Sequence, residues 1–453
     1  MMVPRLEKML GIETYASQSL GIGGRIRQFT EDFMVEEVLM DGSKAQVSST
    51  ETLQPVGGGR YLICVLVKQD WDTFLAVKKV ARRLGISPKR IQIAGIKDAK
   101  AYTAQHISIR GVTPERVSRV KIRDISVHPL RFSDERVYSQ LLLGNQFHIT
   151  IRTISHSSSV IEKRVKNIQN ELSSLGGVPN FFGHQRFGTI RPITHLVGKF
   201  LVRGDLEKAA LTYLAKPSPN EHPESRKARQ QLQDTQDFAE ALRCFPPHLR
   251  YERFMLVRLA KQPKDFIGAF RKLPSKLRRL FVQAYQSFLF NKFLSQRLKR
   301  EVGFNEAQVG DYVVHLDRHG LPTNEFEQAT VQSLSSVKKA LKEGKMQVAV
   351  PLIGFKQHPS EGVQGEIEKK IIKDENVIPR NFYIPSLPEI SAPGRLRTVL
   401  VPITDLSLEE ASRDSSSPPK RKLRLSFTLH RGSYATVLLR EFMKPRNLIN
   451  AGF

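Results

Sequence analysis

The sequence predicts a mixed α/β domain in a chain that is long enough for two or three domains. Strand-like and helix-like segments alternate over residues 26–175, which is typical of such a domain. The chain has 453 residues and 40% of them are hydrophobic, so it can bury more than one core. After residues 180–188 the sequence becomes largely helical and basic, and strand and helix character returns near the C-terminus.

The N-terminal segments predict a strand, a loop, a second strand and a helix. Residues 26–39 begin like a strand and carry an acidic patch, a Ser/Thr/Gly-rich loop follows at 43–59, and residues 61–67 are strand-like. Asp72 is expected to cap a helix that runs to Leu84. One face of this helix is apolar and the other is basic, so the basic face is either solvated or in contact with phosphate. The apolar face contains Val77, Val80, Ala81 and Leu84, and the basic face contains Lys78, Lys79, Arg82 and Arg83.

The middle of the chain continues the alternation and then changes. Strands are predicted at residues 91–94, 103–110 and 146–152, and a helix at 160–175. A Pro/Ser-rich segment, KPSPNEHPES at 216–225, is predicted to be a linker within the basic helical region that follows.

The C-terminal part contains the strongest helical pattern. A helix is predicted at 275–300, because Leu277, Phe281, Ala284 and Phe288 repeat at helical spacing. Short strands with many Gly and Pro are expected between residues 309 and 402. The low-complexity stretch 412–422 is predicted to be an exposed hairpin tip or loop, and residues 423–442 a strand, a turn and a helix.

The charge balance indicates a polyanionic partner. Lys and Arg number 71 against 44 Asp and Glu, which gives a formal net charge of +27 and favours nucleic acid or an anionic membrane surface. The longest apolar stretches, such as residues 61–67, are too short to span a bilayer. The N-terminus lacks the apolar core of a signal peptide. We therefore expect a soluble, cytoplasmic protein, with nucleic acid favoured over a membrane surface as its partner.

Neither a disulfide framework nor a metal site is predicted. Cys64 and Cys244 are the only cysteines and no CxxC motif is present. His315 and His319 are four residues apart, but Gly320 and Pro322 indicate a loop there and no third ligand is evident.

Asp98 is the most informative single residue. It lies in GIKDAKAYTAQ, residues 95–105, between Lys97 and Lys100. An acid flanked by two lysines should ionise readily, and an ionised carboxylate can act as a nucleophile or base. The alternative is structural, because an aspartate before Ala-Lys-Ala is also a good helix N-cap. Strand-like segments on both sides favour a turn between ordered elements.

Four separated segments of the chain form a recognisable set. They are EDFMVEE at 31–37, AGIKDAKAYTAQ at 94–105, NFFGHQRFG at 180–188 and LSFTLHRGSYATVLLREF at 425–442. Together they resemble one family, the TruD-type tRNA pseudouridine synthases. Two shorter segments, AYQSFLFN and GNQFHI, add to the match, which runs in order along nearly the whole chain. The length is similar to that of archaeal members.

The resemblance implies an α+β fold in three stretches of chain. A pseudouridine synthase catalytic domain with a mixed, largely antiparallel sheet would be interrupted by an inserted α/β TRUD domain. Residues 1–180 would form the N-terminal part of the catalytic domain, 181–400 the inserted domain, and 401–453 the C-terminal strand and helix that complete the catalytic domain.

The resemblance also implies roles for individual residues. Asp98 would be the catalytic aspartate, as nucleophile or base, and Lys97 is a candidate for stabilising its charge. Four further positions would surround the target nucleotide, where an aromatic platform and a polar group for the uracil edge are needed. These positions are Phe33, Asn145, Phe147 and Tyr434. Core packing is the alternative for the two phenylalanines.

Gln185 and Arg186 belong to the NFFGHQRFG segment. The resemblance leaves two roles open for them, which are contact with RNA and bracing of the junction between domains.

The implied activity is isomerisation of uridine to pseudouridine at position 13 of tRNA. It needs neither a cofactor nor an obligate protein partner. Two alternatives remain: a non-catalytic basic tRNA-binding or RNA-folding protein, and a nucleotide-dependent RNA enzyme. The second rests on the glycine clusters at 21–25 and 56–60, which lack the Lys-Ser/Thr of a phosphate-binding loop.

Overall fold

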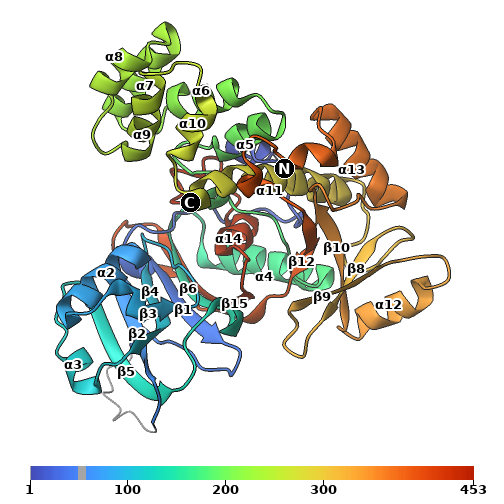
Figure 1. Ribbon diagram of the computed structural model, residues 1–453. Helices are drawn as coiled ribbons and strands as arrows, with labels where there is room; N and C mark the ends of the chain where they lie inside the picture. The colour runs from blue at the N-terminus through green and yellow to red at the C-terminus, as the bar shows by residue number, and fades with distance from the viewer. Residues whose placement is uncertain (1, 49–57) are drawn as a thin grey trace. The chain divides into compact units, whose positions relative to one another are not determined.

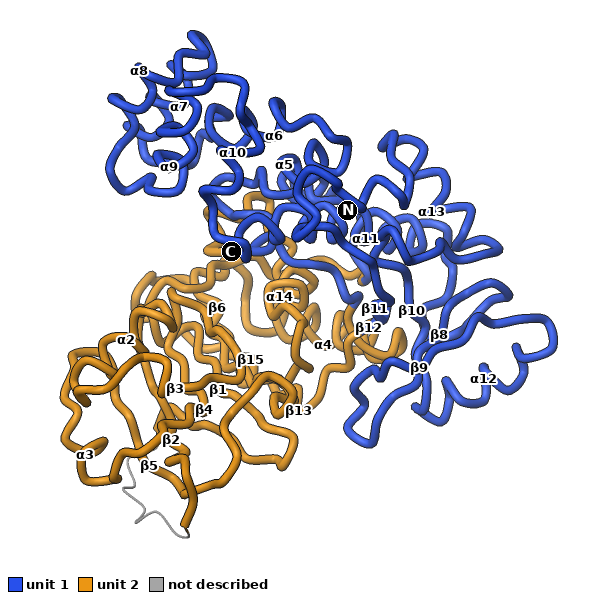
Figure 2. Tube along the Cα trace, in the orientation of Figure 1, with its two compact units in different colours: residues 1–16, 179–400 blue, residues 17–178, 401–453 orange. Residues whose placement is uncertain are grey.

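The computed structural model describes residues 2–48 and 58–453 and divides into two compact units (Figures 1 and 2). Unit 1 contains residues 1–16 and 179–400, and unit 2 contains residues 17–178 and 401–453. Residues 1–16 therefore pack within unit 1, whereas the domain bounds expected from the sequence put them in the same domain as Asp98. The predicted loop at 43–59 and the glycine cluster at 56–60 lie partly outside the described residues.

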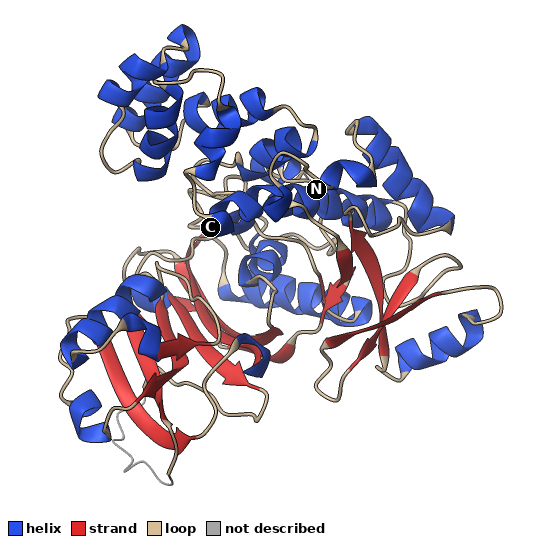
Figure 3. Cartoon of the chain, in the orientation of Figure 1, coloured by secondary structure: helices blue, strands red, loops and turns tan. Residues whose placement is uncertain are grey.

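Unit 2 is built on a mixed, largely antiparallel sheet, as predicted (Figure 3). Along the sheet the strand order is β13-β15-β6-β1-β4-β2-β5, with β14 paired to β15 and β3 paired to β4. Within the described residues, β1 and β4 are the parallel pair and the other pairs are antiparallel. The strands are β1 (Phe33–Leu39), β2 (Tyr61–Gln69), β3 (Ile91–Ile93), β4 (Tyr102–Arg110), β5 (Ile125–Ser133), β6 (Leu142–Ile154), β13 (Thr404–Leu408), β14 (Ser412–Arg413) and β15 (Arg421–His430).

The predicted helix after Asp72 is α2 (Thr73–Leu84), and its cap is as expected. The Asp72 carboxylate accepts hydrogen bonds from the backbone N–H groups of Phe74 and Leu75, and Gly85 ends the helix with φ +65°. The apolar face packs on β2 and β4, where Leu66 and Ile107 are buried. The four basic side chains of the other face are exposed.

The remaining helices of unit 2 are α3 (Pro114–Ser118), α4 (Ser158–Leu175) and α14 (Ala435–Met443), with short 3-10 turns at η1 (Thr30–Asp32), η2 (Pro88–Arg90) and η3 (Ser139–Leu141). The predicted helix at 160–175 and the predicted strand, turn and helix at the C-terminus are confirmed. The segment 412–422 is the β14–β15 hairpin, as predicted. The chain passes between the units at β7 (Val178–Pro179) and β12 (Leu400–Val401).

Unit 1 is organised around the long helix α11 (Ser275–Lys299), which is the helix predicted at 275–300. Phe281 and Ala284 are fully buried. Gly198 of α5 (Thr194–Val202) lets that helix approach closely, because a Cβ there would lie 1.9 Å from the Phe281 carbonyl oxygen.

The N-terminal segment also packs on α11. The side chains of Asn291 and Ser295 donate to the carbonyl oxygens of Leu10 (2.9 Å) and Gly11 (2.7 Å), which satisfies these backbone groups within unit 1. The short helix α1 (Arg5–Met9) precedes this contact.

A four-stranded antiparallel sheet forms another part of unit 1, with the order β11-β10-β8-β9. Two helices accompany it that the sequence analysis did not predict, α12 and α13 (Figure 1). These elements are β8 (Tyr312–Leu316), β9 (Pro322–Gln328), α12 (Leu334–Lys342), β10 (Met346–Leu352), α13 (Gly362–Asp374) and β11 (Arg395–Thr398), with 3-10 turns at η5 (Pro379–Phe382) and η6 (Pro388–Ile390).

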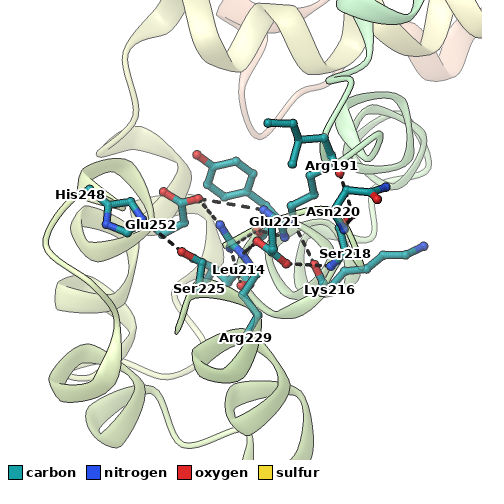
Figure 4. Close-up of polar contacts among 12 residues, drawn as sticks. Arg191, Leu214, Lys216, Ser218, Asn220, Glu221, Ser225, Arg229, His248 and Glu252 are labelled. Carbon is teal, nitrogen blue, oxygen red and sulfur yellow. Dashed lines mark hydrogen bonds and ion pairs between the residues drawn. The ribbon is translucent and has the colours of Figure 1, made fainter. Parts of the chain in front are cut away.

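The helical, basic part of unit 1 contains the segment 216–225. It is an ordered connection rather than a linker between domains, because a buried ion-pair network holds it (Figure 4). Arg229, 2% exposed, donates to Glu221 Oε2 (2.9 Å) and Glu252 Oε1 (2.7 Å). The Ser218 hydroxyl donates to the Ile190 carbonyl (2.6 Å). The helices here are α6 (Leu206–Ala215), α7 (Pro223–Thr235), α8 (Phe238–Cys244), α9 (Arg250–Leu259) and α10 (Phe266–Arg271).

Candidate active site

Asp98 lies in unit 2, on the loop that joins β3 to β4. No helix begins after it, because the chain passes through bends at residues 99–101 directly into β4. The N-cap alternative is therefore wrong, and the predicted turn between ordered elements is confirmed.

Three buried side chains fix the backbone of this loop. Lys68 of β2 donates from Nζ to the Asp98 carbonyl oxygen at 2.7 Å. The Thr73 hydroxyl, at the start of α2, accepts from the Lys97 N–H (3.1 Å) and donates to the Lys97 carbonyl (3.3 Å). Gln105 of β4 donates from Nε2 to the Gly95 carbonyl (3.0 Å). The loop is thus held from three directions, which positions a side chain more precisely than a loop held only at its ends.

The Asp98 side chain remains accessible. It is 40% exposed, and its Oδ1 lies 3.5 Å from Nη2 of Arg27, whose side chain is 15% exposed. Among the described residues, the ion pair with the Asp98 carboxylate is formed by Arg27 and not by Lys97 or Lys100, the two lysines near it in the sequence. Arg27 lies 71 positions away from Asp98 in the sequence, so no local pattern identifies it as the partner.

Arg27 is held from more than one side. Its guanidinium carbon lies 3.9 Å from the centre of the Phe33 ring, which is a cation–π contact. Its Nη1 donates to the Gly452 carbonyl at 3.3 Å. Burial lowers the pKa of Arg27 and the charge of Asp98 raises it. The backbone at Arg27 is left-handed, with φ +56°, which is uncommon for a residue other than glycine.

The Lys97 side chain points into the protein. It is not paired with the Asp98 carboxylate, whose charge it was expected to stabilise. Its side chain is 4% exposed, and its Nζ lies 2.7 Å from Glu37 Oε1 and 2.7 Å from Asn145 Oδ1. The backbone N–H of His106 also donates to Glu37, at 2.9 Å. Burial alone would raise the pKa of Glu37, but contacts with His106 and Lys97 outweigh it and lower that pKa. Lys97 is therefore the salt-bridge partner of a buried carboxylate.

The two predicted aromatic residues lie on adjacent strands. Phe33 of β1 and Phe147 of β6 meet edge to face, with ring centres 6.3 Å apart, and Phe147 stacks on Phe427 of β15 at 5.3 Å. Phe33 is 1% exposed and Phe147 is 6% exposed. Both rings thus pack in the core, as the alternative for these residues anticipates, and Arg27 covers a face of Phe33.

Asn145 and Tyr434 lie at the ends of neighbouring strands. Asn145, on β6, is paired in register with Glu37 of β1 and Leu429 of β15. The chain leaves β15 through Arg431, whose N–H donates to the Leu143 carbonyl (2.9 Å), and reaches Tyr434 at the start of α14. Both side chains are partly exposed.

Gln185 and Arg186 lie in unit 1, on a 3-10 turn at η4 (His184–Arg186). Arg186 reaches α11, where its Nη2 donates to Gln283 Oε1 (3.2 Å) and its Nε donates to Ser287 Oγ (3.4 Å). Gln185 is exposed.

Other classes of site are not found where the structure is described. Among residues 2–48 and 58–453, no three His, Cys, Asp or Glu side chains are grouped so as to hold a metal ion. In the same residues, no helix is both long and apolar enough to cross a bilayer. Burial raises the pKa of Cys64 far above its usual value, and Cys244 is exposed.

The sequence matches the family model of tRNA pseudouridine synthase D (TruD) over residues 9–442. It is 41% identical over 445 residues to a protein from Methanosarcina barkeri named "Probable tRNA pseudouridine synthase D", with 98% of each chain covered. A protein of the same name from Thermococcus onnurineus is 37% identical over 433 residues, which cover 95% of this chain and 97% of that protein.

The structure is also similar to a crystal structure described as that of the "Putative tRNA pseudouridine synthase D (TruD)" from Methanosarcina mazei. The TM-score is 0.85 at 40% sequence identity, with 98% of this chain and 99% of that chain covered. The relatives match the chain almost from end to end, and the structural match extends the agreement to the fold. The chain therefore belongs to the TruD family of tRNA pseudouridine synthases.

Proposed function

We propose that this chain converts uridine to pseudouridine at position 13 of tRNA, with Asp98 as the catalytic carboxylate and without a cofactor. Its family membership supports an isomerase that acts on tRNA. The observation that carries the assignment of Asp98 is its setting. A partly exposed carboxylate stands on a firmly held loop, 3.5 Å from a largely buried guanidinium.

The reaction balances with one carboxylate and no other reagent. The bond between N1 of uracil and C1′ of ribose breaks, the base turns, and C5 bonds to C1′. C5 loses its proton and N1 gains one, so nothing is oxidised or reduced. Asp98 either attacks C1′ as a nucleophile or removes the C2′ proton to give a glycal intermediate. Both routes need an ionised, accessible carboxylate close to the ribose.

Arg27 and Lys97 serve this carboxylate and the uracil in different ways. Arg27 supplies a positive charge and a hydrogen bond that hold Asp98 in one orientation. Lys97 acts through Asn145, because its Nζ donates to the amide oxygen and leaves the amide N–H groups to face a uracil carbonyl. Phe33 contacts Arg27 and packs against Phe147 in the core of the sheet. The partly exposed Tyr434 is the better candidate for stacking on the base.

The basic surface of unit 2 supports contact with the tRNA backbone. Helix α2 begins at Thr73, which holds the Asp98 loop, and it exposes Lys78, Lys79, Arg82 and Arg83. In a chain with net charge +27, these side chains are suited to phosphate.

In this proposal unit 2 is the catalytic domain and unit 1 is the inserted TRUD domain. Gln185 and Arg186 in unit 1 contribute further RNA contacts. A substrate such as tRNA is consistent with a cytoplasmic location.

The test is release of tritium from tRNA that carries [5-³H]uridine, in buffer without nucleotide or methyl donor. Release by the purified chain, lost when a transcript with cytidine at position 13 replaces the substrate, supports the activity and its position. If the chain binds tRNA and releases no tritium, the non-catalytic alternative stands. If tritium is released equally from the cytidine-13 transcript, the assignment of the position is wrong.

A further inference from the structure

A pocket within unit 1 is lined by cationic side chains, and none of its lining residues is assigned to catalysis. Its volume is about 280 Å³. The NFFGHQRFG segment contributes Arg186, α11 contributes Arg279, and the start of β11 contributes Arg395. No carboxylate belongs to the lining, which consists of described residues only. Glu389 lies next to it in sequence and is paired with a different arginine, Arg278.

Neutral acceptors hold two of these arginines in place. Arg279 donates from Nε to the carbonyl oxygen of Glu389 at 2.9 Å. Arg186 donates to the amide oxygen of Gln283 at 3.2 Å. Arg395 is exposed at the rim. Three guanidinium groups therefore line one cavity whose lining contains no carboxylate.

Polar groups in the wall suit an oxygen-rich anion. The Ser391 Oγ accepts from the Ile384 N–H at 2.9 Å, which leaves its hydroxyl proton to be donated elsewhere. The cavity volume falls just below the range of about 300–1,000 Å³ that is common for drug-sized ligands. A phosphate group with its adjoining ribose matches this size better than a complete nucleotide. Guanidinium groups bind phosphate oxygens in pairs, which a lysine cannot do.

We propose that this pocket binds one phosphodiester group of the RNA backbone. The inference rests on the proposed function only in that the ligand is RNA. It gives unit 1 a specific binding role, with Arg279 and Arg395 as the principal ligands and Arg186 as the third. Because the ligand is backbone, the contact contributes affinity and register and carries no base specificity.

The experiment compares two pairs of substitutions in the full chain. R279Q/R395Q removes two charges from the pocket. R243Q/R250Q removes two charges from exposed positions of the same unit that do not line the pocket, and serves as the control. The dissociation constant for tRNA is measured by filter binding over a range of potassium chloride concentrations. Thermal melting and circular dichroism verify that both variants are folded.

We expect R279Q/R395Q to weaken tRNA binding about tenfold near 0.1 M salt, and to reduce the slope of log Kd against log salt by about 1 to 2. The control should change Kd less than about threefold and leave the slope within about 0.5. The kcat for tritium release at saturating tRNA should stay within about twofold of wild type, because neither Arg279 nor Arg395 is assigned a part in the chemical step. R395Q alone changes an exposed position, so it should fold even if the double variant does not. It should weaken tRNA binding and reduce the salt slope by less than the double variant does.

Three results would overturn the proposal. One is an equal loss of affinity in both double variants, which would indicate only the general field of a basic protein. Another is a lower kcat with unchanged Kd. The third is stabilisation of the wild-type protein by inorganic phosphate with unaltered tRNA affinity in R279Q/R395Q, which would indicate a site for free anions. The measurements of tRNA affinity need no catalytic activity, so absence of tritium release by wild type would refute the proposed function and leave the binding test of this pocket intact.

Discussion

The Arg27 Nη2 atom lies 3.5 Å from Oδ1 of Asp98, while the same guanidinium covers the Phe33 ring at 3.9 Å. One side chain thus connects the candidate catalytic carboxylate to the aromatic cluster of the sheet. The carboxylate is solvent-accessible, and the arginine behind it is largely buried. This arrangement leaves part of the Asp98 carboxylate open to solvent, while Arg27 contacts its Oδ1 atom.

Replacement of Arg27 tests whether this contact positions Asp98. For R27Q we expect kcat for tritium release to fall by about 10 to 100-fold, because the carboxylate loses a charge-assisted hydrogen bond worth about 1.5–3 kcal/mol. R27K keeps the charge and loses the planar contact with Phe33, so we expect a smaller loss. The KM for tRNA should change less than kcat in both variants. A variant in which KM rises and kcat is unchanged would show that Arg27 binds RNA instead.

The buried pair of Lys97 and Glu37 should be necessary for stability. Glu37 is 0% exposed, and K97M leaves its charge without the ammonium group 2.7 Å away. We expect a loss of about 3–5 kcal/mol in the free energy of unfolding, measured by urea denaturation. K97M/E37Q should recover part of this loss, since the double variant buries no carboxylate at that position.

An exposed ion pair provides the matched control for that measurement. Arg123 and Asp124 lie 3.4 Å apart, with side chains 95% and 45% exposed. R123Q should therefore alter the free energy of unfolding by less than about 0.5 kcal/mol. Equal effects of K97M and R123Q would contradict the importance of the buried pair.

Lys68 predicts a pH dependence of stability in the alkaline range. Burial lowers the pKa of Lys68 from 10.5 to about 8, and the charge of Asp98 opposes this shift. Between about pH 8 and 10.5 the unfolded chain then holds more protons at this lysine than the folded chain does. Stability consequently rises with pH in this window relative to a variant without the lysine. Below about pH 8 both states are protonated and the relative stability is constant.

The measurement compares wild type with K68M by urea denaturation from pH 7 to 10.5. The difference in free energy of unfolding, wild type minus variant, should increase by at most about 3 kcal/mol above pH 8. A difference that is flat, or that decreases above pH 8, would show that Lys68 is not a buried amine of lowered pKa.

Local patterns predicted those parts of the fold that depend on neighbouring residues. The Asp72 cap, the amphipathic face of α2 and the spacing of apolar residues along α11 are all local, and the structure has them as expected. The helices α12 and α13 were not predicted, because the segment that contains them has many Gly and Pro and was interpreted as a series of short strands. The grouping of residues 1–16 with unit 1 depends on hydrogen bonds to Asn291 and Ser295, which are far away in sequence, so no local pattern predicts it.

The partner of Asp98 was not predictable from adjacent residues. Sequence places Lys97 and Lys100 beside the carboxylate, but consecutive side chains of an extended loop point in different directions. Lys97 is buried and Asp98 is partly exposed. The actual cation, Arg27, approaches from the segment before η1, and a positive backbone φ contributes to its placement. Only the tertiary structure brings these two residues together.

The most direct test of the account is the activity of D98N. This substitution keeps the shape of the side chain and removes its charge, on a loop that Lys68, Thr73 and Gln105 hold through backbone atoms. We expect tritium release from [5-³H]uridine tRNA to fall to background, with Kd for tRNA within about threefold of wild type and unchanged thermal stability. Turnover by D98N at the wild-type rate would contradict the assignment of Asp98 as the catalytic carboxylate.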